Sequence, residues 1–300
     1  MAALTNVTVF GTGVLGSQIM MQAAYHGKSV TGYDVSEELL AKLPQRWEWM
    51  RGYYQRDLPD YDAERFDRAV AAIRTSTDVA DAVAQADLVI EAIPENLDLK
   101  RKVWGQIGQA APAETIFATN TSSLRPSDFA EATGRPDRFL ALHFANLIWS
   151  HNTGEVMATP ATDPRCFDAV MRFAGEIGLV PVPVRKEVPG YILNSVLIPF
   201  LNAGAQLYVD EVADPADIDA VWRIATQSPF GPFQGFDIVG FNVAYNISRN
   251  SPDPKMRKFA DMLKQSIDAG RSGLADRAGF FTYDAEGNRG EPVAAWKLEN

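Results

Sequence analysis

Short apolar runs alternate with segments of helical periodicity through the first part of the chain. Helical spacing of apolar residues predicts helices between the runs. Strands that alternate with helices are typical of a parallel sheet with crossover helices, so we expect a doubly wound α/β domain. The strands predicted in this way are Asn6–Phe10, Ser29–Tyr33, Leu88–Glu91, Ile116–Thr119, Phe139–His143, Glu155–Ala158 and Val180–Val184. The helices are Val14–His26, Ser36 to about Arg51, Ala63–Ile73, Leu97–Ala110 and Pro164–Ile177.

The strand pattern stops after Val184, and amphipathic segments follow one another from Pro189 onward. They predict an all-α domain with helices at Asn194–Val209, Asp217–Ala225 and Phe236–Ile247. We therefore expect two domains, residues 1–187 and residues 188–300. The apolar faces of these helices exceed what a domain of this size needs for its own core, which indicates a subunit interface. Residues 284–300 are polar apart from 293–296 and read as a tail whose order the sequence does not determine.

Composition excludes several classes of protein. The 38 acidic residues outnumber the 28 Lys and Arg, so the net charge of −10 disfavours a nucleic-acid partner. The single cysteine, Cys166, cannot form an internal disulfide, and no His/Cys cluster has metal-ligand spacing, so we expect no metal. No apolar run approaches the ~18 residues of a membrane helix. The N-terminus has no basic lead before its first strand, so we expect a soluble, cytoplasmic protein.

A glycine motif directly follows the first predicted strand and opens the first helix. It reads Gly11-Thr-Gly13-Val14-Leu15-Gly16, and in this context it is typical of a Rossmann-type dinucleotide site. Its glycines allow a tight turn, close approach of a pyrophosphate, and helix–strand packing, while the helix N-terminus meets the phosphates. Asp34 ends the second strand, where a carboxylate accepts bonds from the ribose hydroxyls of NAD and repels the extra phosphate of NADP. A glycine turn needed only for packing is the alternative, but it does not explain Asp34.

The chain has three histidines, the side chain that most often transfers protons near neutral pH, so the candidates for such a group are few. His26 lies at a predicted helix end, where a structural role is the better interpretation. His143 ends an apolar strand at the carboxyl edge of the sheet, where open α/β folds bind ligands. The segment Ala118–Leu124 ends another strand there with hydroxyl and amide groups. These groups either bind a carbonyl oxygen or cap the following turn, and the residues alone favour neither.

The chain resembles the 3-hydroxyacyl-CoA dehydrogenases from about residue 5 to residue 283. The resemblance rests on the order and spacing of several motifs. They are the glycine motif with Asp34, Glu91-Ala-Ile-Pro-Glu95-Asn-Leu with Lys100, Asn120-Thr-Ser122-Ser-Leu124, Arg138-Phe-x-x-x-His143-Phe, Pro189-Gly-Tyr-Ile-Leu-Asn194, Gly231-Pro-Phe and Gly279-Phe-Phe-x-Tyr283.

The resemblance implies an NAD-dependent enzyme that interconverts 3-hydroxyacyl and 3-ketoacyl compounds. It implies that His143 is the general acid–base group and that Glu155 is the carboxylate that orients it. Ser122 and Asn194 would bind the substrate oxygen. Because Asn194 begins the helical domain, the active site would lie in a cleft between the domains. The resemblance further implies a homodimer formed by the helical domain and an L (S) alcohol. It also implies cofactor contacts from the glycine motif with Val14 and Leu15, and from Asp34, Glu95, Lys100 and Asn120.

Two segments depart from the family pattern. After His143 the family has a further phenylalanine and prolines, whereas this chain has Trp149 and His151, which we expect to change the lining of the substrate pocket. In 47–56 a lysine-rich face used by coenzyme A-dependent relatives is replaced by arginines and aromatics. The aromatics are either ordinary packing residues or a sign of weaker acyl-CoA binding.

Both departures resemble a branch of the family that contains diketoreductases, which reduce β- or δ-keto groups of esters, and L-gulonate 3-dehydrogenase-like crystallins. A diketoreductase, a sugar-acid dehydrogenase and a non-catalytic NAD-binding crystallin-like protein therefore stay as alternatives. The presence of four matching site residues argues against the non-catalytic alternative. A β-hydroxyacid dehydrogenase is disfavoured because its catalytic lysine motif has no counterpart here.

Overall fold

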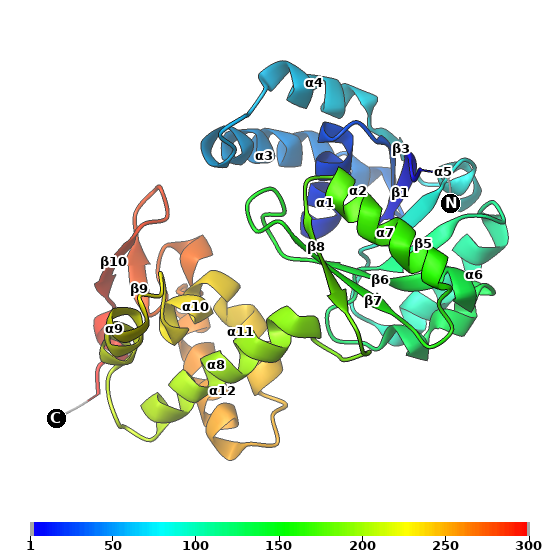
Figure 1. The fold of residues 1–300 in the computed structure, drawn as a ribbon. Helices are drawn as coiled ribbons and strands as arrows, with labels where there is room; N and C mark the ends of the chain where they lie inside the picture. Colours follow the sequence, from blue (N-terminus) through cyan, green and yellow to red (C-terminus); the bar gives the residue numbers. More distant parts are fainter. Residues whose placement is uncertain (1–2, 299–300) are drawn as a thin grey trace. The chain divides into compact units, whose positions relative to one another are not determined.

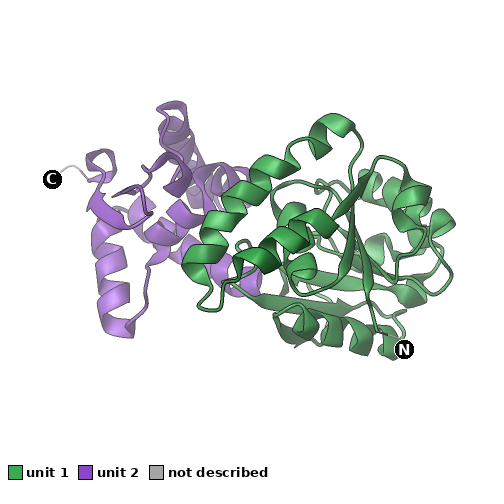
Figure 2. Ribbon diagram, turned by 90° about the horizontal axis from the view of Figure 1, so that it is seen from above, with its two compact units in different colours: residues 1–192 green, residues 193–300 purple. Residues whose placement is uncertain are grey.

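The computed structural model describes residues 3–298, which form two compact units, residues 1–192 and 193–300 (Figure 2). The sequence placed this boundary at 187/188. The segment after the last strand stays with the first unit because Ser127 donates to Glu187 through its backbone N–H and its hydroxyl. Tyr191, a few residues later, is fully buried in the same unit.

The first unit is built on one sheet with the order β3-β2-β1-β4-β5-β6-β7-β8 (Figure 1). Neighbouring strands are parallel except β6 and β7, which are antiparallel because the short loop between them leaves no room for a crossover helix. Each predicted strand is present, and β3 is an additional short polar edge strand that carries no hydrophobic signal. The strands are β1 Asn6–Phe10, β2 Ser29–Tyr33, β3 Arg74–Ser76, β4 Leu88–Glu91, β5 Ile116–Thr119, β6 Phe139–Phe144, β7 Thr153–Ala158 and β8 Val180–Val184.

Helices pack on both faces of this sheet. Side chains that alternate along β1 and β4 enter two different cores, with Val9 and Ile90 on one face and Phe10 and Val89 on the other. The helix predicted from Ser36 is divided, because Pro44 begins a new helix that continues beyond the predicted end. The helices are α1 Val14–Tyr25, α2 Glu37–Leu40, α3 Leu43–Asp57, α4 Ala63–Ala72, α5 Val79–Val83, α6 Leu97–Ala110 and α7 Pro164–Glu176.

The second unit is helical around an aromatic core that contains Phe233, Phe236, Phe280 and Trp296. The helix predicted at Phe236–Ile247 is broken at Gly240, whose φ of +89° is left-handed. The all-α prediction missed a small hairpin of β9 Phe281–Tyr283 and β10 Arg289–Pro292. The helices are α8 Tyr191–Val209, whose first two residues belong to the first unit, α9 Pro215–Thr226, α10 Pro232–Val239, α11 Phe241–Ser248 and α12 Pro254–Asp268.

The polar C-terminal segment is anchored to this core. Val293 N–H donates to Phe280 O, and Trp296 Nε1 donates to Gly279 O at 2.9 Å. Trp296 is only 6% exposed. A single buried aromatic residue therefore orders a segment that composition left open.

Among the described helices, α8 is long and apolar enough to cross a membrane by length and composition. The sequence shows no continuous apolar run of this length because polar residues interrupt the segment. Leu201, Ala205 and Tyr208 are buried in the core of the second unit, and Gln206 Nε2 donates to Asp253 Oδ2 at 2.7 Å. One face of α8 is therefore part of the hydrophobic core of the second unit.

Candidate active site

The predicted catalytic residues of the first unit come from neighbouring strand ends. Ser122 follows β5, His143 lies near the end of β6, and Glu155 lies near the start of β7. In the antiparallel register of β6 and β7, His143 pairs directly with Glu155. Side chains of directly paired residues lie on the same face of a sheet, which brings together two groups that are twelve positions apart.

His143 lies between Glu155 and Ser122. Its Nδ1 is 2.8 Å from Glu155 Oε2, and its Nε2 is 3.2 Å from Ser122 Oγ. Because the carboxylate can only accept, Nδ1 carries a proton and Nε2 is the nitrogen that exchanges one. His143 and Glu155 are each 4% exposed, whereas Ser122 is exposed. The arrangement can deliver or remove one proton beside an accessible hydroxyl.

Glu95 holds the loop that carries Ser122. Its Oε1 accepts from the backbone N–H groups of Ser122 and Ser123, at 2.9 and 2.8 Å, and from the hydroxyl of Thr121 at 2.6 Å. Burial acts to raise the pKa of Glu95, but the hydrogen bonds from Thr121 and Ser123 and the charge of Lys100 outweigh it and lower that pKa to about 2. Glu95 therefore remains a carboxylate at any physiological pH and fixes the backbone of Ser122.

Lys100 is buried, at 1% exposure, between two carboxylates. Its Nζ is 2.5 Å from Glu91 Oε1 and 3.3 Å from Glu95 Oε2. Glu91 also accepts from Ile93 N–H and from the hydroxyl of Thr119, at 3.0 and 2.8 Å. The charged partner of Lys100 is thus Glu91. Glu91 belongs to one of the sequence motifs, but no role was predicted for it. Its position at the end of an apolar strand was the available signal.

The glycine motif has the shape of a phosphate cradle. Gly11 has a φ of +93°, and a Cβ there would lie 2.6 Å from Ala92 O. A Cβ on Gly16 would collide with Gly11 O, whereas a Cβ on Gly13 would meet nothing within 4 Å. The open space beside Gly13 at the N-terminus of α1 fits the pyrophosphate of NAD. Val14, in the first turn, is 58% exposed, and Leu15 packs against the core.

Asp34 and Asn120 lie beside this cradle at other strand ends. Asp34 Oδ2 accepts from the backbone N–H and the hydroxyl of Thr12, at 2.8 and 2.6 Å. A carboxylate oxygen has further lone pairs, so the ribose contact predicted for Asp34 is compatible with this bond. Asn120 Oδ1 accepts from Phe144 N–H at 3.0 Å and joins the ends of β5 and β6. These residues are compatible with NAD, and the contact of Asp34 with the ribose stays a prediction.

Asn194 lies on α8 in the second unit. That Asn194 and Ser122 lie together in a cleft between the domains therefore remains a prediction from the sequence. Residues of the adjoining segment that the sequence analysis left without a role, above all Tyr191, contact the site directly. The ring of Tyr191 is stacked on that of His143, with centroids 4.3 Å apart.

Trp149 is a packing residue and does not line an open pocket. It is 4% exposed, its ring contacts Tyr54, and its Nε1 donates to Asp57 Oδ2 at 2.9 Å. The expectation that it changes the lining of the pocket is not supported, because the loop turns this side chain toward α3. His151 is exposed, and its Nδ1 is 2.9 Å from the carbonyl oxygen of Asn146 in the same loop.

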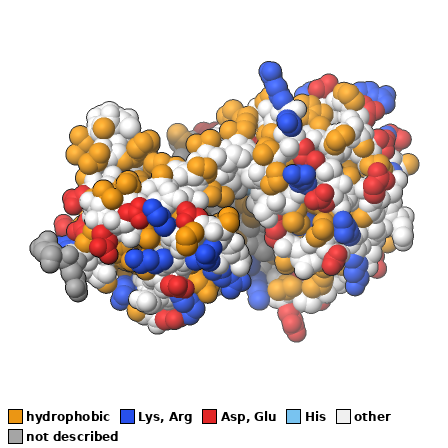
Figure 3. Space-filling model, turned by 90° about the horizontal axis from the view of Figure 1, so that it is seen from below, with side chains coloured by type: hydrophobic (Ala, Val, Ile, Leu, Met, Phe, Trp, Pro, Cys, Tyr) orange, Lys and Arg blue, Asp and Glu red, His pale blue; other side chains and the backbone are white. Residues whose placement is uncertain are grey.

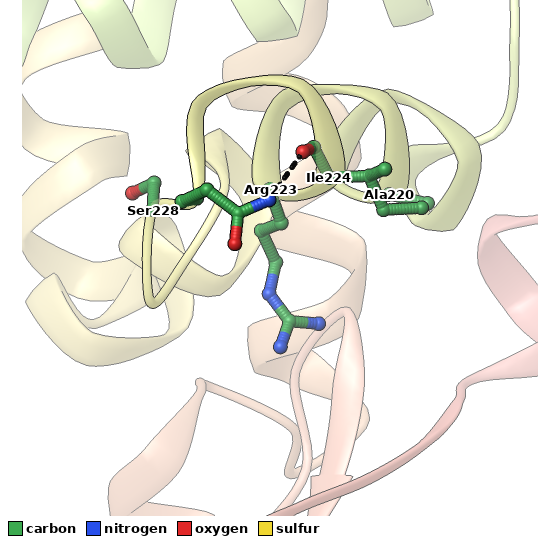
Figure 4. A pocket seen from close by; sticks show the side chains of 5 residues that line it. Ala220, Arg223, Ile224 and Ser228 are labelled. Carbon is green, nitrogen blue, oxygen red and sulfur yellow. Dashed lines mark hydrogen bonds between the residues drawn. The ribbon is translucent and has the colours of Figure 1, made fainter.

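The second unit has a hollow that none of the predicted site residues lines. A hollow of 360 Å³ at the end of α9 is lined by Ala220, Arg223, Ile224, Gln227 and Ser228, none of which was predicted as a site residue (Figure 4). Within residues 3–298, no group of three or more His, Cys, Asp or Glu side chains could hold a metal ion.

Comparisons with known proteins agree with the motifs. Residues 6–188 match the family model described as 3-hydroxyacyl-CoA dehydrogenase, NAD binding domain, and residues 190–283 match its C-terminal domain. The human mitochondrial hydroxyacyl-coenzyme A dehydrogenase is 37% identical over 288 residues, covering 93% of this chain and 91% of the relative.

Solved structures extend the likeness to the whole fold. A diketoreductase, described in terms of substrate-directed dual catalysis of dicarbonyl compounds, is 52% identical with a TM-score of 0.91, covering 94% of this chain and all of the other. The (S)-3-hydroxybutyryl-CoA dehydrogenase of Ralstonia eutropha is 28% identical with a TM-score of 0.80, again covering 94% and 100%.

Proposed function

The chain belongs to the 3-hydroxyacyl-CoA dehydrogenase family and is an NAD-dependent oxidoreductase of CH–OH groups, and from that premise we propose that His143 is its proton donor and acceptor. The observation that carries the proposal is the hydrogen-bonded row of Ser122 Oγ, His143 Nε2, His143 Nδ1 and Glu155 Oε2. In this row one ring nitrogen is held by a carboxylate and the other faces an exposed hydroxyl. That is the arrangement a general acid–base group requires.

NAD, when bound, supplies the chemistry of hydride exchange with the carbon that carries the substrate oxygen. In reduction, His143 Nε2–H protonates that oxygen as negative charge develops on it, and Glu155 stabilises the imidazolium from which the proton leaves. In oxidation, unprotonated Nε2 removes the hydroxyl proton. Ser122 Oγ, 3.2 Å from Nε2, binds the same oxygen, and Asn194 is proposed as its second donor.

The first candidate substrate is a 3-ketoacyl or 3-hydroxyacyl thioester, supported by relatives named for hydroxyacyl-CoA and 3-hydroxybutyryl-CoA. This assignment would place the protein in fatty acid metabolism. The second candidate is a β-keto or β,δ-diketo ester. It is supported by the diketoreductase at 52% identity and by the exposed face of α3. There Trp49, 43% exposed, stacks on Tyr53, and the Arg56 guanidinium lies over Tyr53.

A substrate panel tests the function. NADH absorbance is followed with acetoacetyl-CoA, ethyl acetoacetate and a 3,5-diketo ester in reduction, and with L-gulonate and NAD in oxidation. The thioester as best substrate supports the first candidate, and preference for the free esters supports the second. His143→Ala should lower kcat by about 10² to 10⁴-fold while NADH still binds. Turnover of no substrate by a wild-type protein that binds NADH would sink the enzymatic proposal.

A homodimer formed through the helical unit is part of the proposal. Several large apolar side chains of this unit are exposed, and Figure 3 shows hydrophobic side chains at its surface interspersed with charged ones. Exposed apolar surface of this extent is typical of a subunit interface. The residues are Val196 and Leu207 on α8, Val221, Trp222 and Ile224 on α9, Ile238 on α10, and Val243 and Ile247 on α11.

A cytoplasmic location completes the proposal. It is supported by the use of a single cysteine, Cys166, which is buried and cannot form an internal disulfide. Fractionation of cells with an antibody against the protein checks it, and recovery in a membrane or secreted fraction would contradict it.

A further inference from the structure

The segment Gly190–Ile192, where the first unit ends and α8 begins, contacts each of the three catalytic groups of that unit. Gly190 N–H donates to the carbonyl oxygen of Ser122 at 3.1 Å. The Tyr191 ring lies flat on the His143 imidazole, with an interplanar angle of 8°. Ile192 N–H donates to Glu155 Oε1 at 2.8 Å, the carboxylate oxygen that His143 does not use. One short segment thus contacts all three residues that form the proton-transfer row.

The backbone of this segment is held in a conformation that aims the ring. Tyr191 has a φ of +54°, and Gly190 before it has a φ of +85°. A bulky residue in the left-handed region is strained and persists only where surrounding contacts impose it. Tyr191 is also fully buried. Because strain of this kind is concentrated at functional sites, its occurrence on the residue that stacks on His143 indicates a function.

Two physical effects follow from these contacts. A flat aromatic face 4.3 Å away restricts rotation of the imidazole and interacts favourably with its cationic form. The backbone N–H of Ile192 donates to Glu155 Oε1 at 2.8 Å, and a hydrogen bond from a backbone N–H to a carboxylate stabilises the ionised form. Glu155 is therefore held in place from the side opposite His143.

We propose that Tyr191 is a positioning residue of this enzyme, which holds the His143 ring in the plane that proton transfer requires. The proposal rests on the proposed role of His143. The aromatic ring of Tyr191 positions the imidazole, and the backbone N–H of Ile192 holds Glu155 in place.

Three substitutions at position 191 distinguish the contribution of the aromatic ring from that of the backbone conformation. Tyr191→Phe keeps the ring, Tyr191→Leu removes the flat face, and Tyr191→Gly removes the ring while accepting the left-handed backbone without strain. We expect the Phe variant to keep kcat within about threefold of wild type, and the Leu and Gly variants to lose about 10 to 100-fold. The Kd of NADH, measured by fluorescence, should change by less than about twofold in all three. Wild-type kcat in the Leu or Gly variant, or an equal loss in the Phe variant, would overturn the proposal.

A double-mutant cycle distinguishes positioning from a general effect on folding. If Tyr191 acts through His143, Tyr191→Leu should lower the residual rate of His143→Ala by less than about twofold, since residues that act as a unit are not additive. An additive loss in the double variant would show that Tyr191 acts elsewhere. Failure of the proposed function would instead abolish turnover in the wild type, so the two failures are distinguishable.

Discussion

At the scale of the residue, the chemistry depends on how the two oxygens of Glu155 are shared. Oε2 accepts from His143 Nδ1, and Oε1 accepts from Ile192 N–H. Only a carboxylate can accept on both sides. The pair therefore fixes both the tautomer of His143 and the start of α8.

Glu155→Gln tests this requirement. The NH2 group of glutamine would have to face the N–H of Ile192, or else face His143 Nδ1 and force the ring into the tautomer with the proton on Nε2. A neutral amide would also no longer stabilise an imidazolium. We expect kcat/KM to fall by about 10²-fold or more in either direction of the reaction. The Kd of NADH serves as the control and should not change. Activity within a few-fold of wild type would show that the carboxylate is not the partner of the catalytic histidine.

At the scale of the element, the β6–β7 loop is fixed by packing against α1 and α3. Gln18 Oε1 accepts from Leu147 N–H at 2.8 Å, and Trp149 Nε1 donates to Asp57 Oδ2. Ile148 is 1% exposed. The residues in which this loop differs from the family pattern therefore stabilise the loop by packing against the rest of the first unit.

Trp149→Phe should destabilise the fold without changing the chemistry. It deletes the indole N–H that bonds the mostly buried Asp57 carboxylate, so we expect the free energy of unfolding to fall by about 1 to 2 kcal/mol. Urea denaturation measures this change. A changed KM for the keto substrate with unchanged stability would return Trp149 to the substrate pocket.

A buried carboxyl makes the second unit sensitive to pH. Burial raises the pKa of Asp237 from 3.8 to about 7, because the hydrogen bonds from Phe280, Tyr283 and Phe281 offset only part of its desolvation. Between these two values the folded state keeps a proton that the unfolded state loses. Stability should therefore fall as pH rises from about 4 to about 7 and should not fall further above that range on account of this group.

Asp237→Asn removes the titration. The variant should lose stability at low pH because an amide cannot accept from all three donors, but its dependence on pH between about 4 and 7 should be flatter than that of the wild type. Urea midpoints across that range measure the two slopes. Parallel slopes would show that Asp237 titrates normally.

At the scale of the whole molecule, the exposed apolar side chains of the second unit support association with a second copy. Ile224 is 74% exposed on α9, at the edge of the hollow shown in Figure 4. Ile224→Glu should convert the dimer to a monomer because it would place a charge in an apolar interface. Light scattering after size exclusion measures the mass. Val35→Glu, equally exposed but in the first unit, should leave the dimer intact, and a wild-type monomer would contradict the proposal.

The sequence by itself determined the buried strands of the first unit, the cofactor motif and the identity of the candidate catalytic groups. Apolar runs such as Leu88–Glu91 are recognisable because a central strand is buried on both faces. Gly13 is recognisable because it falls in the turn that joins the first strand to the first helix, and Asp34 because it directly follows the second strand. These features are local, so local patterns reveal them. His143 could be singled out by its place at a strand end, although its role came from the resemblance.

Only the tertiary structure decided which side chains meet. Register between β6 and β7 pairs His143 with Glu155, and burial of Trp296 orders the C-terminal segment. The direction in which Trp149 points and the stacking of Tyr191 on His143 depend on packing between elements that are far apart in sequence. No local pattern encodes such contacts, because burial and direction are set by the neighbours that the fold supplies.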